Sequence, residues 1–126
     1  MPFTSTMRED EPNSVPATSR RLAGRTKKAT DVLEIPAINN MAAERTGYPT
    51  QKPLALLDVL VRACCPPGGV VLDPFAGSGT TGVAAILEHR RFIGVEMTEH
   101  YADVAAARLA EAETGRDPRQ AQEALL

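Results

Sequence analysis

The chain has 126 residues, which is enough for at most one small domain, and its net charge of −2 at pH 7 predicts no general attraction to nucleic acid. Aromatic residues make up 4% and tryptophan is absent, so the core has to be built from Ala, Leu, Val and Ile. No run approaches the roughly 18 apolar residues of a membrane span, and there is no apolar signal region, so we expect a soluble cytoplasmic protein without membrane contact.

Residues 1–30 are rich in Pro, Ser, Thr, Arg and Lys, and their few hydrophobic residues are too scattered to form a stripe. Such a segment cannot bury enough apolar area to offset its ordering entropy, so we predict a disordered or loosely attached tail. A basic cluster within it is interpreted as part of a solvated tail rather than as a phosphate-binding arm; it comprises Arg20, Arg21, Arg25, Lys27 and Lys28.

Residues 31–47 predict an extended or turn stretch with one helical turn at 41–45. A helix over 53–64 should follow, because Pro53 suits a first helical position and the leucines and valines after it form a broad apolar face. The run Pro66-Pro67-Gly68-Gly69 ends it. Cys64 and Cys65 are adjacent, and neighbouring cysteines rarely satisfy disulfide geometry. Two thiols alone make no metal site, so we interpret both as small buried hydrophobic residues. This cysteine usage suits a reducing compartment.

The second half predicts a strand at 70–73, a helix over about 79–89, a strand at 91–96 and a helix from 98 or 99 to about 115. A helix followed by strand, helix, strand and helix is an α/β, partial Rossmann-like pattern. We therefore predict one partial domain over residues 31–115, with the N-terminal tail before it and a frayed C-terminal tail at 116–126.

A glycine turn joins the first of these strands to its helix. Gly77 and Gly79 supply positive φ angles and leave room for a ligand, and the N–H groups at the helix start favour a carboxylate or phosphate. Glu96 lies 23 residues after Asp73 at the tip of the next strand, which matches the position of a ribose-binding acid. Together these features predict cofactor binding, although Gly77, Gly79 and Gly82 alone match G-x-G-x-x-G weakly and Asp73 could simply cap the turn.

The stretch from Asp73 to Thr81, DPFAGSGTT, preceded by Tyr48 to Pro53, YPTQKP, resembles the amino-methylating DNA methyltransferases over roughly residues 33–110. These enzymes of DNA methylation and restriction–modification transfer a methyl group from S-adenosylmethionine to adenine N6 or cytosine N4. The resemblance implies a methyltransferase fold, S-adenosylmethionine as cofactor and DNA as partner.

The resemblance also implies roles for individual residues. The turn would hold the methionine part of the cofactor, Glu96 the ribose, and a second segment would sit beside the amino-acid end. Met97 and Tyr101 could line the adenine, with core packing as the alternative. The implied cofactor-binding residues are Asp73, Pro74, Phe75, Gly77, Gly79, Thr80 and Glu96, with Thr50, Gln51 and Lys52.

One motif of the family is missing. The amine of the flipped base is positioned in this family by an Asp/Asn/Ser-Pro-Pro-aromatic loop. The single Pro-Pro here, Pro66-Pro67, follows Cys65 and precedes Gly68, so no catalytic residue is assigned. The chain resembles the C-terminal half of the subgroup whose catalytic half comes first, and a complementary catalytic chain is implied for activity.

Two alternatives stay open. The chain could be a non-catalytic remnant or small binding module, with or without cofactor affinity. A nicotinamide-dinucleotide-binding fragment rests only on Gly77, Gly79 and Gly82 and leaves residues 48–53 unexplained. Whether the chain alone is an enzyme is not decided by its sequence.

Overall fold

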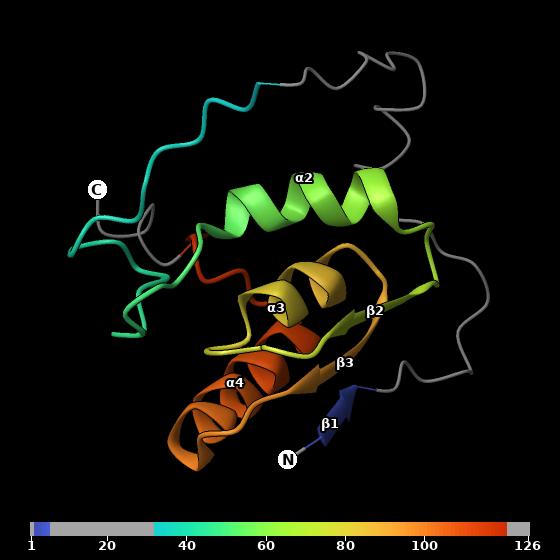
Figure 1. The fold of residues 1–126 in the computed structure, drawn as a ribbon. Helices are drawn as coiled ribbons and strands as arrows, with labels where there is room; N and C mark the ends of the chain where they lie inside the picture. The colour runs from blue at the N-terminus through green and yellow to red at the C-terminus, as the bar shows by residue number, and fades with distance from the viewer. Residues whose placement is uncertain (1, 6–31, 121–126) are drawn as a thin grey trace.

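The computed structural model describes residues 2–5 and 32–120, and within them helices and strands alternate (Figure 1). The predicted helix–strand–helix–strand–helix order is confirmed, with boundaries within about two residues of those expected. The elements are β1 (Pro2–Ser5), α2 (Leu54–Cys64), β2 (Val70–Asp73), α3 (Thr80–Leu87), β3 (Arg91–Val95) and α4 (Glu99–Glu113).

The three strands form one sheet in the order β1-β3-β2. β2 runs parallel to β3, with Val71 beside Phe92, and α3 makes the crossover between them. β1 runs antiparallel to β3, with Phe3 beside Gly94. The parallel pair connected by a helix is the Rossmann-like unit that the sequence predicted.

Both ends of the described chain differ from the sequence prediction. Residues 2–5, expected in the loosely attached tail, form β1, because the N–H and C=O groups at the β3 edge provide the pairing that their own sequence does not signal. The basic cluster lies outside the described residues. At the other end, residues 117–119 of the segment expected to be frayed are held by Arg119, whose guanidinium pairs with Asp117 and with the buried Asp58 of α2; residues 121–126 lie outside the described residues.

Two local predictions were also wrong. Residues 41–45 form turns rather than a helical turn, because the Asn39 side chain accepts a hydrogen bond from Met41 N at 2.9 Å and directs the chain into a turn. Cys64 is exposed and Cys65 half-buried, both as free thiols. Cys65 is covered only in part, by the proline-glycine turn that brings Gly69 against its Sγ, and Cys64 lies exposed in the last turn of α2.

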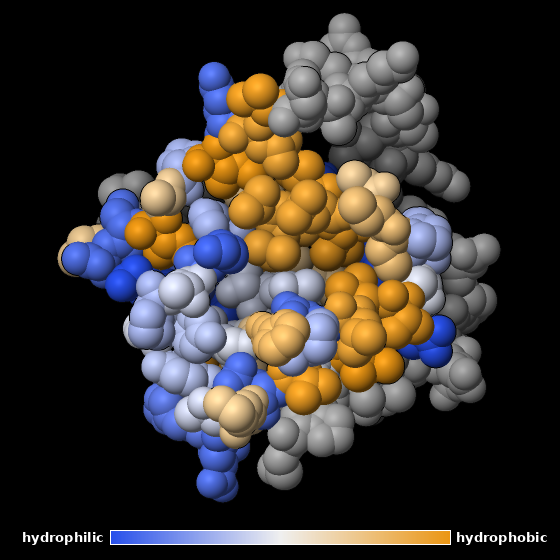
Figure 2. All heavy atoms as spheres, viewed as in Figure 1, coloured by the Kyte–Doolittle hydropathy of each residue, from blue (hydrophilic) through white to orange (hydrophobic). Residues whose placement is uncertain are grey.

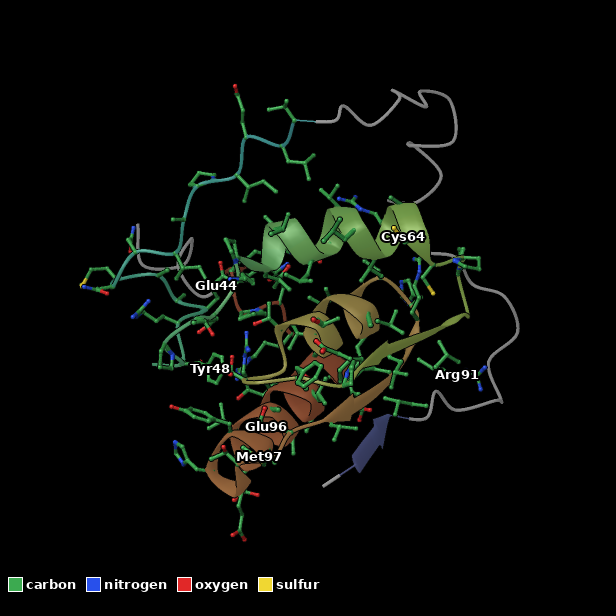
Figure 3. All side chains as sticks on the ribbon, in the orientation of Figure 1. Glu44, Tyr48, Cys64, Arg91, Glu96 and Met97 are labelled. Carbon is green, nitrogen blue, oxygen red and sulfur yellow. The ribbon has the colours of Figure 1, made fainter. Side chains whose placement is uncertain are left out.

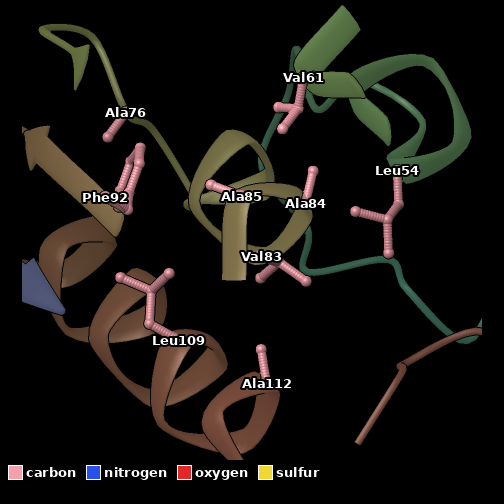
Figure 4. Close-up of a cluster of buried hydrophobic side chains, with 9 residues drawn as sticks. All are labelled: Leu54, Val61, Ala76, Val83, Ala84, Ala85, Phe92, Leu109 and Ala112. Carbon is pink, nitrogen blue, oxygen red and sulfur yellow. The ribbon is translucent and has the colours of Figure 1, made fainter. Parts of the chain in front are cut away.

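The core is centred on α3, which packs against α2, α4, β2 and β3 (Figure 4). Small residues on α3 let its neighbours approach closely, and Phe92 of β3 and Leu109 of α4 meet at Gly82. Burial of these apolar side chains is the main force that holds the three helices together on one side of the sheet. The cluster comprises Leu54, Val61, Ala76, Val83, Ala84, Ala85, Phe92, Leu109 and Ala112.

The opposite face of the sheet is open among the described residues. Side chains alternate along a strand, so Val70 and Leu72 point away from the face that carries Val71, and they are 45% and 63% exposed. Figure 2 shows hydrophobic side chains gathered on the surface over α2 and β2. A parallel sheet is normally covered on both faces, so this open face is unusual for a complete α/β domain.

Within the described ranges, no helix has both the length and the apolar character that a membrane crossing requires.

Candidate cofactor site

The site lies where β2 and β3 end, because parallel strands bring their carboxyl ends to one edge of the sheet. Asp73 ends β2, and its Oδ1 accepts a hydrogen bond from Phe75 N at 3.0 Å, so it does cap the turn. Its Oδ2 has no hydrogen bond within residues 2–5 and 32–120 and can accept one from a ligand.

The turn from Asp73 to α3 depends on two glycines in the left-handed region. Gly77 has φ +56° and Gly79, the N-cap of α3, has φ +82°. The Tyr48 ring lies directly against Gly77, where an added Cβ would be 2.9 Å from Tyr48 Cζ. The Tyr48 ring also packs edge-on against the Tyr101 ring, with 4.6 Å between the ring centroids. Gly77 therefore needs to be glycine both for its backbone angle and for its contact with Tyr48.

Glu96 connects the tip of β3 to the glycine turn. Its Oε2 accepts from Gly77 N at 2.9 Å and its Oε1 from Thr98 N at 2.9 Å. The Thr98 hydrogen bond, helped by that from Gly77, outweighs desolvation and lowers the pKa of Glu96, which is ionised at neutral pH. Hydrogen bonds from the Thr98 side chain and from Met97 N lower the pKa further, so the end of β3 itself holds this carboxylate in place. Figure 3 shows Glu96 and Tyr48 at the same end of the molecule, away from Cys64 and Arg91.

The segment before α2 is organised by the Gln51 side chain. Its Oε1 accepts from Thr46 N at 2.8 Å and Thr46 Oγ1 at 2.7 Å, while its Nε2 donates to the Glu44 carbonyl at 2.6 Å. The Glu44 carboxylate in turn accepts from Leu54 N at 2.8 Å and so caps the N-terminus of α2. The amide of Gln51 is therefore engaged in shaping the loop, and the loop brings Lys52 to the turn.

The two predicted motifs line one cavity of about 280 Å³. Seven of the ten predicted residues lie in its wall: Thr50, Gln51, Lys52, Asp73, Phe75, Gly77 and Thr80. Glu96 reaches this wall through its bond to Gly77. Pro74 and Gly79 are not in the lining; Gly79 instead packs on α4, where a Cβ would lie 2.8 Å from Ala105 Cβ.

Sequence reasoning did not assign the remaining lining residues, Tyr48, Leu57, Ala76, Ser78 and Thr81. Four of these residues lie inside the two motifs quoted above: Tyr48, Ala76, Ser78 and Thr81. The assigned motif residues beside them were the sequence signal that could have identified them. Leu57 was expected only on the apolar face of α2. Met97 is 95% exposed and Tyr101 packs on Tyr48, so neither lines the cavity.

Pro66 and Pro67 lie between α2 and β2, at the amino end of β2 and thus at the opposite end of the strand from Asp73. Gly68 N there donates to the His89 carbonyl at 3.0 Å, which gives this turn a structural role. No group of three or more His, Cys, Asp or Glu side chains suited to a metal ion occurs in the described part of the chain.

A strand–glycine turn–helix–strand unit with an acid at each strand tip is a Rossmann-like nucleotide-cofactor domain. Residues 4–107 match the N6/N4 methyltransferase family model, described as DNA methylase. The chain belongs to this family, as its two motifs predicted.

Individual relatives agree with the family. Over 87 residues the chain is 43% identical to the type II methyltransferase M.ScaI of Streptomyces caespitosus, covering 66% of this chain and 29% of that protein. It is 44% identical over 79 residues to the DNA adenine methyltransferase YhdJ of Escherichia coli K12, covering 63% and 27%. The chain thus spans less than a third of these relatives' length. The M1.HpyAVI–SAM complex is similar with a TM-score of 0.51 and 47% identity, covering 52% of this chain and 33% of that one.

Proposed function

We propose that this chain binds S-adenosylmethionine as part of a DNA amino-methyltransferase that acts on adenine N6 or cytosine N4. The observation that carries the proposal is the single cavity shared by the two motifs, with Lys52 and Asp73 in its wall and Glu96 joined to it through Gly77. When bound, S-adenosylmethionine would supply the electrophilic methyl group.

The groups present fit the chemistry of this cofactor. Lys52 and the N–H groups at the start of α3 suit its carboxylate, and Oδ2 of Asp73 suits its ammonium group. The ionised Glu96 carboxylate, at the tip of β3 and joined to Gly77, suits ribose hydroxyls as hydrogen-bond donors. About 280 Å³ is slightly below the usual range for small-molecule pockets, so we infer that the cavity takes the methionine end and that the nucleoside lies over its rim.

We further propose that a complementary chain or segment supplies the catalytic loop, and that DNA contacts depend on it. Within residues 2–5 and 32–120 no strand pairs with the outer edge of β2, and Val70 and Leu72 are exposed; both support this proposal, because a doubly wound sheet would continue past β2 and carry helices on that face. Residues 31–115 remain our boundaries for the cofactor-binding domain. A cytoplasmic location, consistent with the free thiols of Cys64 and Cys65, is part of the proposal.

Calorimetric titration of the full chain with S-adenosylmethionine tests the cofactor assignment. Asp73→Ala and Glu96→Ala should each weaken binding by about 1.5–3 kcal/mol, roughly tenfold to a hundredfold in Kd, because each removes a hydrogen bond between a charged group and the ligand. Asp103→Ala, which removes an exposed carboxylate on α4 outside the cavity lining, is the matched control and should bind like the wild type.

A parallel titration with NAD separates the dinucleotide alternative. Binding of NAD without binding of S-adenosylmethionine would reverse the assignment, and equal losses in all three variants would show that the two acids have no specific role.

A further inference from the structure

Arg108 of α4 reaches across to the glycine turn. Its Nη1 donates to the Ser78 carbonyl at 2.7 Å, to Thr80 Oγ1 at 3.1 Å and to Ser78 Oγ at 3.3 Å. Ser78 and Thr80 are 2% and 6% exposed, and they flank Gly79, where the chain enters α3. One nitrogen of Arg108 therefore bonds to the residues on both sides of the helix start.

The setting of Arg108 is not that of an ordinary surface arginine. Its Nη2 is buried and has no hydrogen-bond partner among the described residues. Desolvation lowers the pKa of the guanidinium, and the negative charges of Glu44 and Glu111 oppose this shift in part. Burying a charged group with an unpaired nitrogen costs stability. Stabilisation of the fold alone therefore does not account for an arginine at this position.

Ser78 and Thr80 both line the cavity, whereas Arg108 does not. We propose that Arg108 is a positioning residue: from α4 it holds Ser78 and Thr80 in place so that the N–H groups at the start of α3 are available to a ligand in the cavity, and it thereby sets cofactor affinity without contacting the cofactor. This inference rests on the proposed function, because it takes S-adenosylmethionine as the ligand of the cavity.

Substitution of Arg108 should separate ligand affinity from stability. Arg108→Met keeps the length and apolar stem of the side chain but removes its hydrogen bonds, and we expect the Kd for S-adenosylmethionine to rise about tenfold or more. Arg108→Lys keeps the charge and one donor group, so it should recover part of the affinity. Titrations are run at a temperature where circular dichroism shows each variant to be folded.

Arg90→Met is the matched control. Arg90 is also a buried arginine that donates to backbone carbonyls, but its partners are Cys65 and Glu88, which are outside the cavity lining. We expect this variant to lose thermal stability while its Kd stays within about twofold of the wild type. An equal rise in Kd for the Arg90 and Arg108 variants would mean that general destabilisation explains the effect, and the inference would be wrong.

Amide hydrogen exchange of the unliganded chain gives a readout that does not depend on the cofactor. The amides of Gly79 and Val83, which donate to the Ala76 and Gly79 carbonyls at 2.9 and 3.0 Å, should exchange faster in Arg108→Met and Arg108→Lys than in the wild type. Unchanged exchange and unchanged Kd in both variants, with a wild type that binds, would overturn this inference alone. A wild type that does not bind S-adenosylmethionine would overturn the proposed function and the inference with it.

Discussion

A Cβ added to Gly82, in the middle of α3, would lie 2.5 Å from both Leu109 Cδ2 and Phe92 Cε1. Alanine is the better helix former by about 1 kcal/mol, but overpacking a core typically costs about 1–3 kcal/mol. Because both neighbours are buried in the core and have little room to move aside, we expect the steric cost to exceed the gain. Gly82→Ala should lower the free energy of unfolding by about 1–2 kcal/mol, measured by urea denaturation.

A double-mutant cycle with Leu109→Ala tests the cause. Removing Leu109 releases one of the two close contacts, so Leu109→Ala should cost less in the Gly82→Ala background than in the wild type. Strictly additive costs would contradict the steric explanation. Gly82 thus contributes to packing between helix and sheet, although the sequence also offered it as part of a ligand-binding glycine pattern.

At the scale of elements, Arg90 connects the C-terminal ends of two helices. Its Nε and Nη2 donate to the carbonyl of Cys65, the C-cap of α2, at 3.0 and 2.7 Å, and its Nη1 donates to the carbonyl of Glu88, the C-cap of α3. The cation also offsets the negative ends of both helix dipoles. Arg90→Met should therefore lower the free energy of unfolding by about 2–3 kcal/mol, because two partly buried carbonyls lose charged donors.

The neighbouring Arg91 offers the control for this prediction. It is exposed on β3, so Arg91→Met should change the free energy of unfolding by less than about 0.5 kcal/mol. Both variants are compared by urea denaturation at the same pH. A loss of similar size in the two would mean that net charge, rather than the contacts of Arg90, determines the result.

The helices and parallel strands were predictable because each carries its own signal: an apolar period, a proline at the helix start or a glycine at its end. β1 was not, because its pairing comes from β3 rather than from residues 2–5 themselves. The roles of Arg90 and Arg108 depend on backbone partners 25 and 30 residues away, which no local pattern encodes. The candidate site was predicted from two sequence motifs. The structural role of Gln51, in contrast, can be recognised only from its hydrogen bonds to Thr46 and Glu44.

For the molecule as a whole, the open side of β2 predicts complementation. Mixing the full chain with a separate chain that carries the rest of such a methyltransferase domain, including the Pro-Pro-aromatic loop, should produce methyl incorporation into DNA. Neither chain alone should produce it, because one has the cofactor cavity and the other the catalytic loop. Incorporation of a labelled methyl group from S-adenosylmethionine is the measurement.

Leu72→Glu tests whether the two chains meet at β2. A carboxylate on the exposed face of that strand would have to be desolvated by the covering element, so complementation should weaken at least tenfold. Leu60→Glu, at another exposed leucine on α2, should complement normally. Full activity of the isolated chain would contradict the prediction, as would complementation that Leu72→Glu leaves intact. Cofactor binding without complementation would instead favour a small binding module.

The edge-on pair of Tyr48 and Tyr101 beside Gly77 has a spectroscopic consequence. These are the two tyrosines of the chain, and it has no tryptophan, so near-ultraviolet emission comes from two rings next to the glycine turn. Their quantum yield and dichroism should respond to occupancy of the turn, and the protein therefore carries an intrinsic optical probe that requires no attached dye.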